Sequence, residues 1–216
     1  MKHFTLTLAM AVSLTSAACL QKDTTSTIYL RQDGSFDWVV LERNVRSDEA
    51  DGAARLSEES AYVAAVDRGE HDVAEGFLAL GAEDVRVRWL RNARPYAVMV
   101  DGRFDDLAAV FDRPLMRCGI PHEVSITHDG ELTTWRLRAD VGPEGEGVDF
   151  NLNEGCDDGL DGLADALAVT IVLESGRFTD VTGFKLEGSD TATFDEEGVE
   201  AAAKATGRFE LALSWR

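Results

Sequence analysis

Two Asp-Gly pairs, at 33–34 and 129–130, constrain the fold of this chain more than any other feature. Each pair lies between two runs of β-prone residues, and the first one joins 27–30 to 36–41. An Asp-Gly pair in this setting indicates a hairpin, because tight hairpin turns need residues that adopt positive φ. The chain is therefore expected to contain antiparallel β-sheet.

Helical signals interrupt the β-prone runs. Ser47, followed by two acidic residues, is expected to cap a helix that ends at Gly69, and apolar residues in 73–80 have the spacing of a second, short helix. Further short helices are expected near 107–111 and 159–166. The remaining strands are expected at 85–89, 95–104, 168–174, 178–186, 191–194 and 209–215.

Hairpins separated by helices predict an α+β fold, in which two to four helices pack against an antiparallel β-sheet. The four tryptophans lie among aliphatic residues in the expected strands and are assigned to the core: Trp38, Trp89, Trp135 and Trp215. Paired acids such as Glu58 and Glu59 are expected on the solvated surface, since adjacent side chains diverge.

The first residues have the pattern of a secretory signal peptide. A basic start at Lys2 precedes an apolar run over 4–18, which ends in small residues and is too short and too polar for a permanent membrane span. We expect three parts: a signal peptide at 1–18, a polar tether at 19–27 and one α+β domain at 28–216.

The segment 14–19, Leu-Thr-Ser-Ala-Ala-Cys, resembles the lipobox of bacterial lipoproteins, although Ser16 stands where that family usually has Leu. The resemblance implies that Cys19 is linked to diacylglycerol and becomes the mature N-terminus. Leu20 follows where Asp marks inner-membrane retention in enteric-type bacteria, which favours the outer membrane. The alternative is ordinary cleavage after Ala18, leaving Cys19 a thiol. The rest of the chain resembles, only in general layout, uncharacterised envelope lipoproteins.

The chain is strongly acidic. Removal of 1–18 takes away Lys2 and no acid, so 20 of the 21 bases and all 40 acids remain, a formal charge of −20. Nucleic acid is excluded as an expected partner, because phosphate binding needs a basic face. The acids are spread along the chain, which indicates a solvated, mutually repelling surface, with an acidic docking face as the alternative.

Cysteine usage predicts a disulfide. Export places the domain in an oxidising compartment, and lipidation would consume Cys19, which leaves Cys118 and Cys156 to pair. The alternative is two buried, reduced thiols.

The best candidate for a metal site lies within 149–162. Oxygen-bearing side chains at Asp149, Asn151, Asn153 and Asp157 resemble the start of a calcium-binding EF-hand loop. The match then fails, because glycine stands seventh and Leu160 occupies the twelfth position, where a bidentate Glu is needed. A strand that ends in an acidic, helix-capping turn explains the same residues, so we expect no cofactor, with calcium as the alternative.

Few other residues indicate chemistry, and none of the common nucleophile, phosphate-loop, dinucleotide or zinc-protease motifs is present. His122 and His128 are six residues apart and would share a face of an unbroken strand, where a metal site with Glu123 or Asp129 is one alternative. Solvated histidines that flank a hairpin are the favoured interpretation.

The sequence thus predicts a lipid-anchored envelope protein, facing the periplasm, with a binding or structural role rather than an enzymatic one. Its expected partners are the membrane, through the N-terminal lipid, and an envelope protein. Two alternatives stay open: a hydrolase or metal-dependent enzyme whose site assembles from distant residues, and a carrier of a small apolar ligand.

Overall fold

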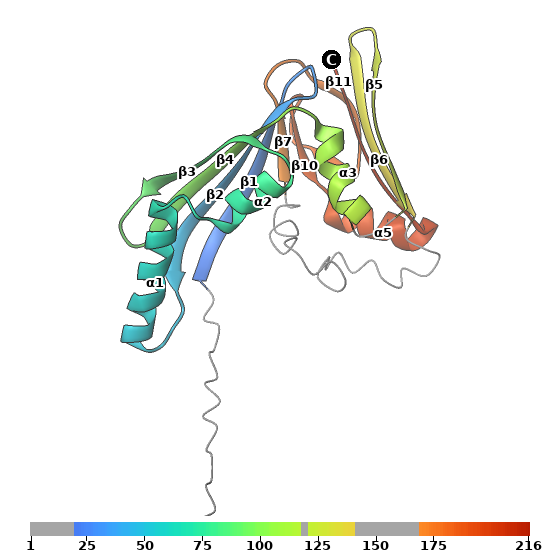
Figure 1. Cartoon of the computed structure of the whole chain (residues 1–216). Coiled ribbons are helices and arrows are strands. Elements are labelled where there is room, and N and C mark those ends of the chain that lie inside the picture. Colours follow the sequence, from blue (N-terminus) through green and yellow to red (C-terminus); the bar gives the residue numbers. More distant parts are fainter. Residues whose placement is uncertain (1–19, 118–120, 141–168) are drawn as a thin grey trace, which may run out of the picture.

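The computed structural model describes residues 20–117, 121–140 and 169–216, and these form two β-sheets with helices (Figure 1). Sheet A has the strand order β3-β4-β2-β1-β7-β10-β9, and sheet B has the order β5-β6-β11-β8. The strands of sheet A are β1 (Leu20–Leu30), β2 (Phe36–Ser47), β3 (Glu83–Arg91), β4 (Tyr96–Phe104), β7 (Val169–Leu173), β9 (Phe184–Leu186) and β10 (Thr191–Phe194). Those of sheet B are β5 (His122–Asp129), β6 (Leu132–Asp140), β8 (Phe178–Thr182) and β11 (Arg208–Trp215).

Four helices are described. They are α1 (Gly52–Asp67), α2 (Asp72–Ala79), α3 (Leu107–Arg117) and α5 (Glu196–Thr206). Helices α1 and α2 cover one face of sheet A, while α3 packs against β5 and β6 and α5 packs against β11 (Figure 1). The expected α+β class and helices on the sheets are confirmed.

The two Asp-Gly hairpins form as predicted. The first joins β1 to β2 and the second joins β5 to β6, with Gly34 at φ 87° and Gly130 at φ 61°. One pairing departs from the antiparallel expectation, because β7 lies parallel to β1. Short turns join the antiparallel hairpins β1–β2 and β5–β6, whereas β1 and β7 lie far apart in the sequence, so their pairing has no local signal.

The core of sheet A lies under α1 and α2. Phe36 stacks on Phe104 with ring centroids 4.8 Å apart. The ring centroids of Trp38 and Phe77 lie 5.2 Å apart. Trp135 and Trp215 are completely buried on the inner face of sheet B, and Trp89 is half-buried at the edge of sheet A. The predicted assignment of the tryptophans to the core therefore holds for three of them, with Trp89 packed against its margin.

The polar segment 20–27 was expected to be a tether, but it forms the first part of β1 and extends the fold to Leu20. Its β-branched threonines favour extended backbone, and they and Ser26 pair with β2. The expected helix cap at Ser47 is also wrong, because Ser47 ends β2 and Asp51 caps α1 by accepting from the Ala54 N–H at 3.0 Å.

The run 178–186, expected as one strand, is two strands in different sheets. Gly183, at φ 74°, separates β8 from β9. Helix α5 was not predicted. Its sequence signals are a short alanine-rich stretch, 201–205, and the N-cap residue Asp195, which accepts a hydrogen bond from the Gly198 N–H at 3.1 Å. Among the described residues, no helix has the length and apolar character to cross a membrane.

Candidate functional site

The predicted lipid, disulfide and calcium residues lie outside the described residues. These are Cys19, Cys118, Cys156, Asp149, Asn151, Asn153 and Asp157. Each of these assignments stays a prediction.

The two histidines of β5 lie at opposite ends of the strand. Six residues of extended chain separate them by about 20 Å, so a metal ion shared by both is ruled out. His122 Nε2 lies 2.9 Å from Asp112 Oδ1 on α3, and His128 Nδ1 lies 3.1 Å from Thr133 Oγ1 on β6. Within the described ranges, no three His, Cys, Asp or Glu side chains are grouped to hold a metal.

His128 instead lines an open hollow of about 610 Å³, formed where three distant segments meet. The lining residues are Gln32, Asp33, His128, Gly130, Glu131, Thr133 and Arg216. They come from the β1–β2 turn, the β5–β6 turn and the end of β11, which lie together at the end of the molecule opposite the start of β1 (Figure 1).

Local hydrogen bonds hold the walls of the hollow. Asp33 Oδ1 accepts from the Ser35 hydroxyl at 2.7 Å and from its N–H at 3.0 Å, and these bonds hold the pKa of Asp33 below its usual value. Gln32 donates to the Ser175 carbonyl at 3.0 Å. The backbone of Arg216 pairs with that of Arg177, which fixes the end of β11 beside the residue that precedes β8.

The hollow therefore presents carboxylates, a guanidinium, an imidazole and an amide together. Groups of both charges suit a polar ligand or a polar loop of a partner protein, because each can pair with an opposite charge or a hydrogen-bonding group. No Phe, Trp, Tyr, Leu, Ile or Val of the described part of the chain lines the hollow.

A second group of polar side chains is buried between sheet A and helices α1 and α2. Its centre is Glu42 of β2, which is fully buried. Lys22 Nζ donates to Glu42 Oε1 at 2.7 Å, and the Tyr62 hydroxyl and His71 Nε2 each lie 3.2 Å from Glu42 Oε2. We call these four residues, from β1, β2, α1 and the N-cap of α2, the Glu42 cluster.

The hydrogen bonds of His71 define its tautomer. Nδ1 accepts from the Val73 N–H at 3.3 Å and so caps α2, which leaves the proton on Nε2 to donate to Glu42. Burial acts to raise the pKa of Glu42, but the hydrogen bonds from His71 and Lys22 and the charge of Lys22 outweigh it and bring the pKa to about 2. Burial, followed by the charge of Glu42, raises the pKa of Tyr62.

Glu59 was expected on the surface, and this is wrong. It is buried on the sheet-facing side of α1, where Oε1 accepts from the Ser47 N–H at 3.2 Å and lies 3.0 Å from Arg94. The buried backbone N–H of Ser47, at the end of β2, needs a hydrogen-bond acceptor, and the Glu59 carboxylate supplies it. Two buried carboxylates thus tie α1 to sheet A.

The sequence contains a signal for one of these sites only. Glu42 continues the alternation of Phe36, Trp38 and Val40, which marks it as an inward-facing charge that needs partners. The hollow has no such signal, because its residues are brought together by the packing of sheet B against the β1–β2 turn.

Few known proteins are similar to this chain. No protein-family model matches the chain, and no curated protein sequence matches it. Among solved structures, it is similar to the folded domain of the lipoprotein LppM from Mycobacterium tuberculosis, determined by NMR, with 11% identity and a TM-score of 0.35 over 90% of this chain and 89% of that one. Similarity this low carries no argument about function.

Proposed function

We propose that this chain is a lipid-anchored protein of the bacterial cell envelope that binds a polar ligand or a partner protein. The signal-like segment 1–18, followed by Cys19 in a lipobox-like setting, is the observation that carries the proposal. Leu20 in place of Asp favours the outer membrane, with the domain facing the periplasm.

The position of β1 supports this function, because it relates the anchor to the hollow. Strand β1 begins at Leu20, directly after Cys19, and runs through the middle of sheet A to the turn that lines the hollow. Its 11 residues span roughly 35 Å. A lipid on Cys19 would therefore hold one end of sheet A at the bilayer, with the hollow at the far end (Figure 1).

Fractionation of cells that express the chain tests the anchor. We expect the protein in the membrane fraction, released by detergent and not by high salt, because acyl chains contribute about 0.8 kcal/mol per buried methylene. Cys19→Ser should release the protein or stall its processing. Cys118→Ser is the matched control and should remain membrane-bound. A Cys19→Ser protein that is processed normally and stays in the membrane fraction would contradict the proposal.

A further inference from the structure

The two sheets have four edge strands among the described strands: β3 and β9 in sheet A, and β5 and β8 in sheet B. An edge strand exposes unpaired backbone N–H and C=O groups, which can pair with another chain unless something prevents it. Strand β3 has two irregularities in its register with β4 and carries arginines. Strands β9 and β8 are short, with three and five residues.

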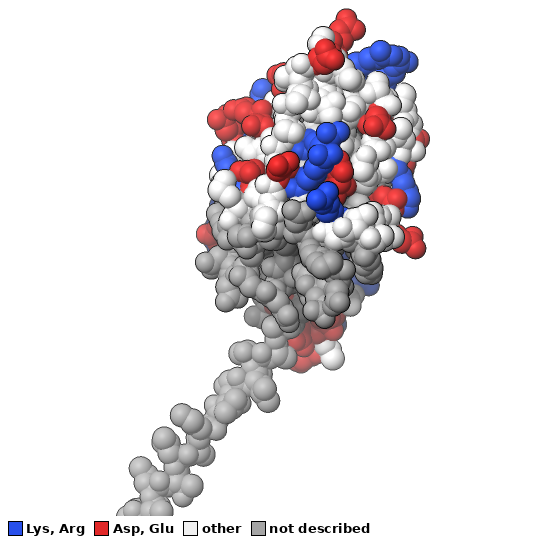
Figure 2. All heavy atoms as spheres, turned by 90° about the vertical axis from the view of Figure 1, so that its right-hand side faces the viewer, with Lys and Arg blue, Asp and Glu red and all other residues white. Residues whose placement is uncertain are grey.

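Strand β5 has none of these protective features. All eight of its residues pair with β6 in an unbroken register, and none of them is Pro, Lys or Arg. The strand lies at the margin of the molecule (Figure 1), on the side that Figure 2 faces. It is therefore the edge, among the four, that is best suited to accept an added strand.

The side chains of β5 define what such a strand would contain. Val124 and Ile126 point inward and are only half-buried, so an added strand with apolar residues beside them would complete the margin of the core. Glu123, Ser125 and Thr127 point outward and are exposed, and they suit polar neighbours.

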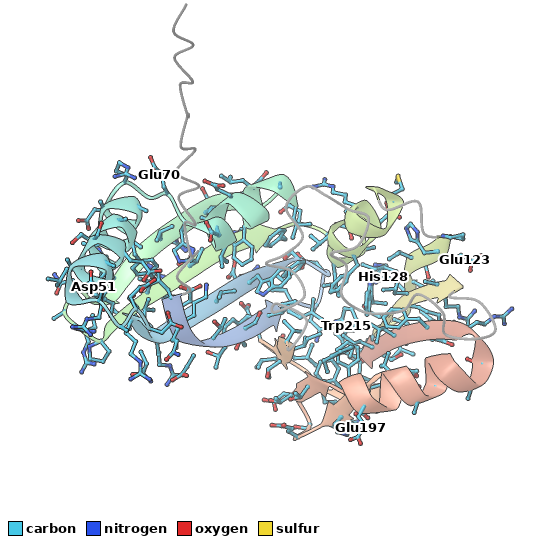
Figure 3. The ribbon with its side chains drawn as sticks, turned by 90° about the horizontal axis from the view of Figure 1, so that it is seen from below. Asp51, Glu70, Glu123, His128, Glu197 and Trp215 are labelled. Carbon is cyan, nitrogen blue, oxygen red and sulfur yellow. The ribbon has the colours of Figure 1, made fainter. Side chains whose placement is uncertain are left out.

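Charges on the outer face add a requirement. Glu210 of β11 accepts from Arg138 Nε at 3.1 Å, and the register places Arg138 opposite Glu123. Across the strands the charges thus alternate from negative to positive to negative, and no described strand continues the row beyond Glu123. Figure 3 shows Glu123 at the outer margin of sheet B. A basic residue in the next strand would extend the alternation.

We propose that the edge of β5 from Glu123 to Thr127, with which no described strand pairs, binds an extended segment of another protein that adds to sheet B as an antiparallel strand. The segment carries apolar residues opposite Val124 and Ile126 and a Lys or Arg opposite Glu123. Because antiparallel strands run in opposite directions, its sequence reads Thr/Ser, apolar, Thr/Ser, apolar, Lys/Arg. This inference does not depend on lipidation of Cys19.

The test uses synthetic peptides and the chain from residue 19 onward with Cys19→Ser. The first probe is Gly-Ser-Thr-Val-Thr-Val-Lys-Ser-Gly, and the second has Glu in place of Lys. We expect saturable binding of the Lys peptide, about two- to fivefold tighter than the Glu peptide, as for a cross-strand charge pair. Hydrogen exchange should slow at alternate amides of β5. A third probe, with Pro in place of the Val opposite Val124, should not bind. The register from the Asp129–Leu132 pair directs the backbone groups of Val124 and Ile126 to the open edge, and Pro lacks the N–H that would face Val124.

Charge exchange locates the contact. Glu123→Lys should reverse the preference between the two peptides, and Glu123→Gln, which changes the shape least, should remove it. Asp180→Lys on the other edge of sheet B changes the net charge equally and should leave the preference intact. An unchanged preference in Glu123→Lys would show attraction to the overall charge of the chain and overturn the proposal.

Two other results would also overturn it. One is absence of binding of the Lys peptide at millimolar concentration with amide exchange in β5 unchanged. The other is sedimentation of the peptide-free chain as a dimer that Ser125→Lys dissociates and Thr182→Lys, on the opposite edge, does not. That result would assign the edge to a second copy of this chain.

Discussion

Glu42 is the residue on which the packing of α1 and α2 over sheet A most depends. A buried carboxylate is costly unless charges and hydrogen bonds surround it, and here Lys22, Tyr62 and His71 supply them from three other elements. The inward position of Glu42 could be read from the alternation along β2. Its partners could not, because Tyr62 and His71 reach it only when both helices have folded onto the sheet.

The low pKa of Glu42 predicts a specific acid sensitivity. Its pKa is about 2 in the fold against an ordinary 4.5, so the unfolded chain binds the proton more readily. The carboxylate therefore stabilises the fold fully above about pH 5 and loses this contribution as the pH falls towards 2, by about 3 kcal/mol. Chemical unfolding from pH 7 to pH 2 measures the change.

Glu42→Gln removes this titration, so the free energy of unfolding of the variant should fall less than that of the original chain over the same pH range. Glu210→Gln is the control, because Glu210 is partly exposed and its ion pairs contribute less than about 1 kcal/mol. Its curve should run parallel to that of the original chain. Parallel curves for the Glu42 variant would contradict the account of the Glu42 cluster.

At the scale of elements, the strands with local signals were predictable and the long-range partners were not. The Asp-Gly turns specify both hairpins, because the turn and its two strands are contiguous in sequence. The parallel pairing of β1 with β7 and the meeting of residues at the hollow join segments that are far apart, and periodicity contains no information about them. The polar segment 20–27 was predicted to be a tether but is a strand, because pairing with β2 and not its own sequence decides its structure.

Gly183 tests the division between β8 and β9. A Cβ at this position would lie 2.3 Å from Leu211 Cδ2 and 3.1 Å from the Glu210 carbonyl oxygen. Gly69 has the same φ of 74° with nothing within 4 Å, so Gly69→Ala meets only the backbone cost, about 1 kcal/mol. Gly183→Ala should cost about 1–3 kcal/mol more in denaturant unfolding. Equal losses in the two variants would show that the site is not tightly packed.

The acidic segment 149–162 has a direct test. We expect the melting temperature to be the same with millimolar calcium as with a chelator, because the segment lacks a glycine at the sixth position and a bidentate Glu at the twelfth position of a calcium loop. A rise in melting temperature with calcium that Asp149→Asn abolishes would establish the alternative, a calcium site.

At the scale of the whole molecule, two covalent features predicted from the sequence connect the fold to its compartment. One is the disulfide between Cys118 and Cys156, which would close a loop of 39 residues. The chain-entropy model gives such a bridge about 4 kcal/mol of stabilisation, a large part of the net stability of a domain. The other is the lipid on Cys19, on which the proposed localisation depends.

The disulfide is tested by the mass of the oxidised, alkylated protein. We expect Cys118 and Cys156 to resist alkylation until a reductant is added, and the reduced protein to unfold at a lower denaturant concentration. Two thiols that alkylate in the unfolded chain without reductant would show that no bridge forms.

The most direct test of the central claim is mass spectrometry of the mature N-terminal peptide, purified from the membranes of a bacterial host that processes lipoproteins. We predict that the peptide begins at Cys19 and carries the mass of a thioether-linked diacylglycerol, with or without a further acyl chain on its amino group. A peptide that begins at Cys19 with the mass of the unmodified residue, or one that still contains residues 1–18, would contradict it.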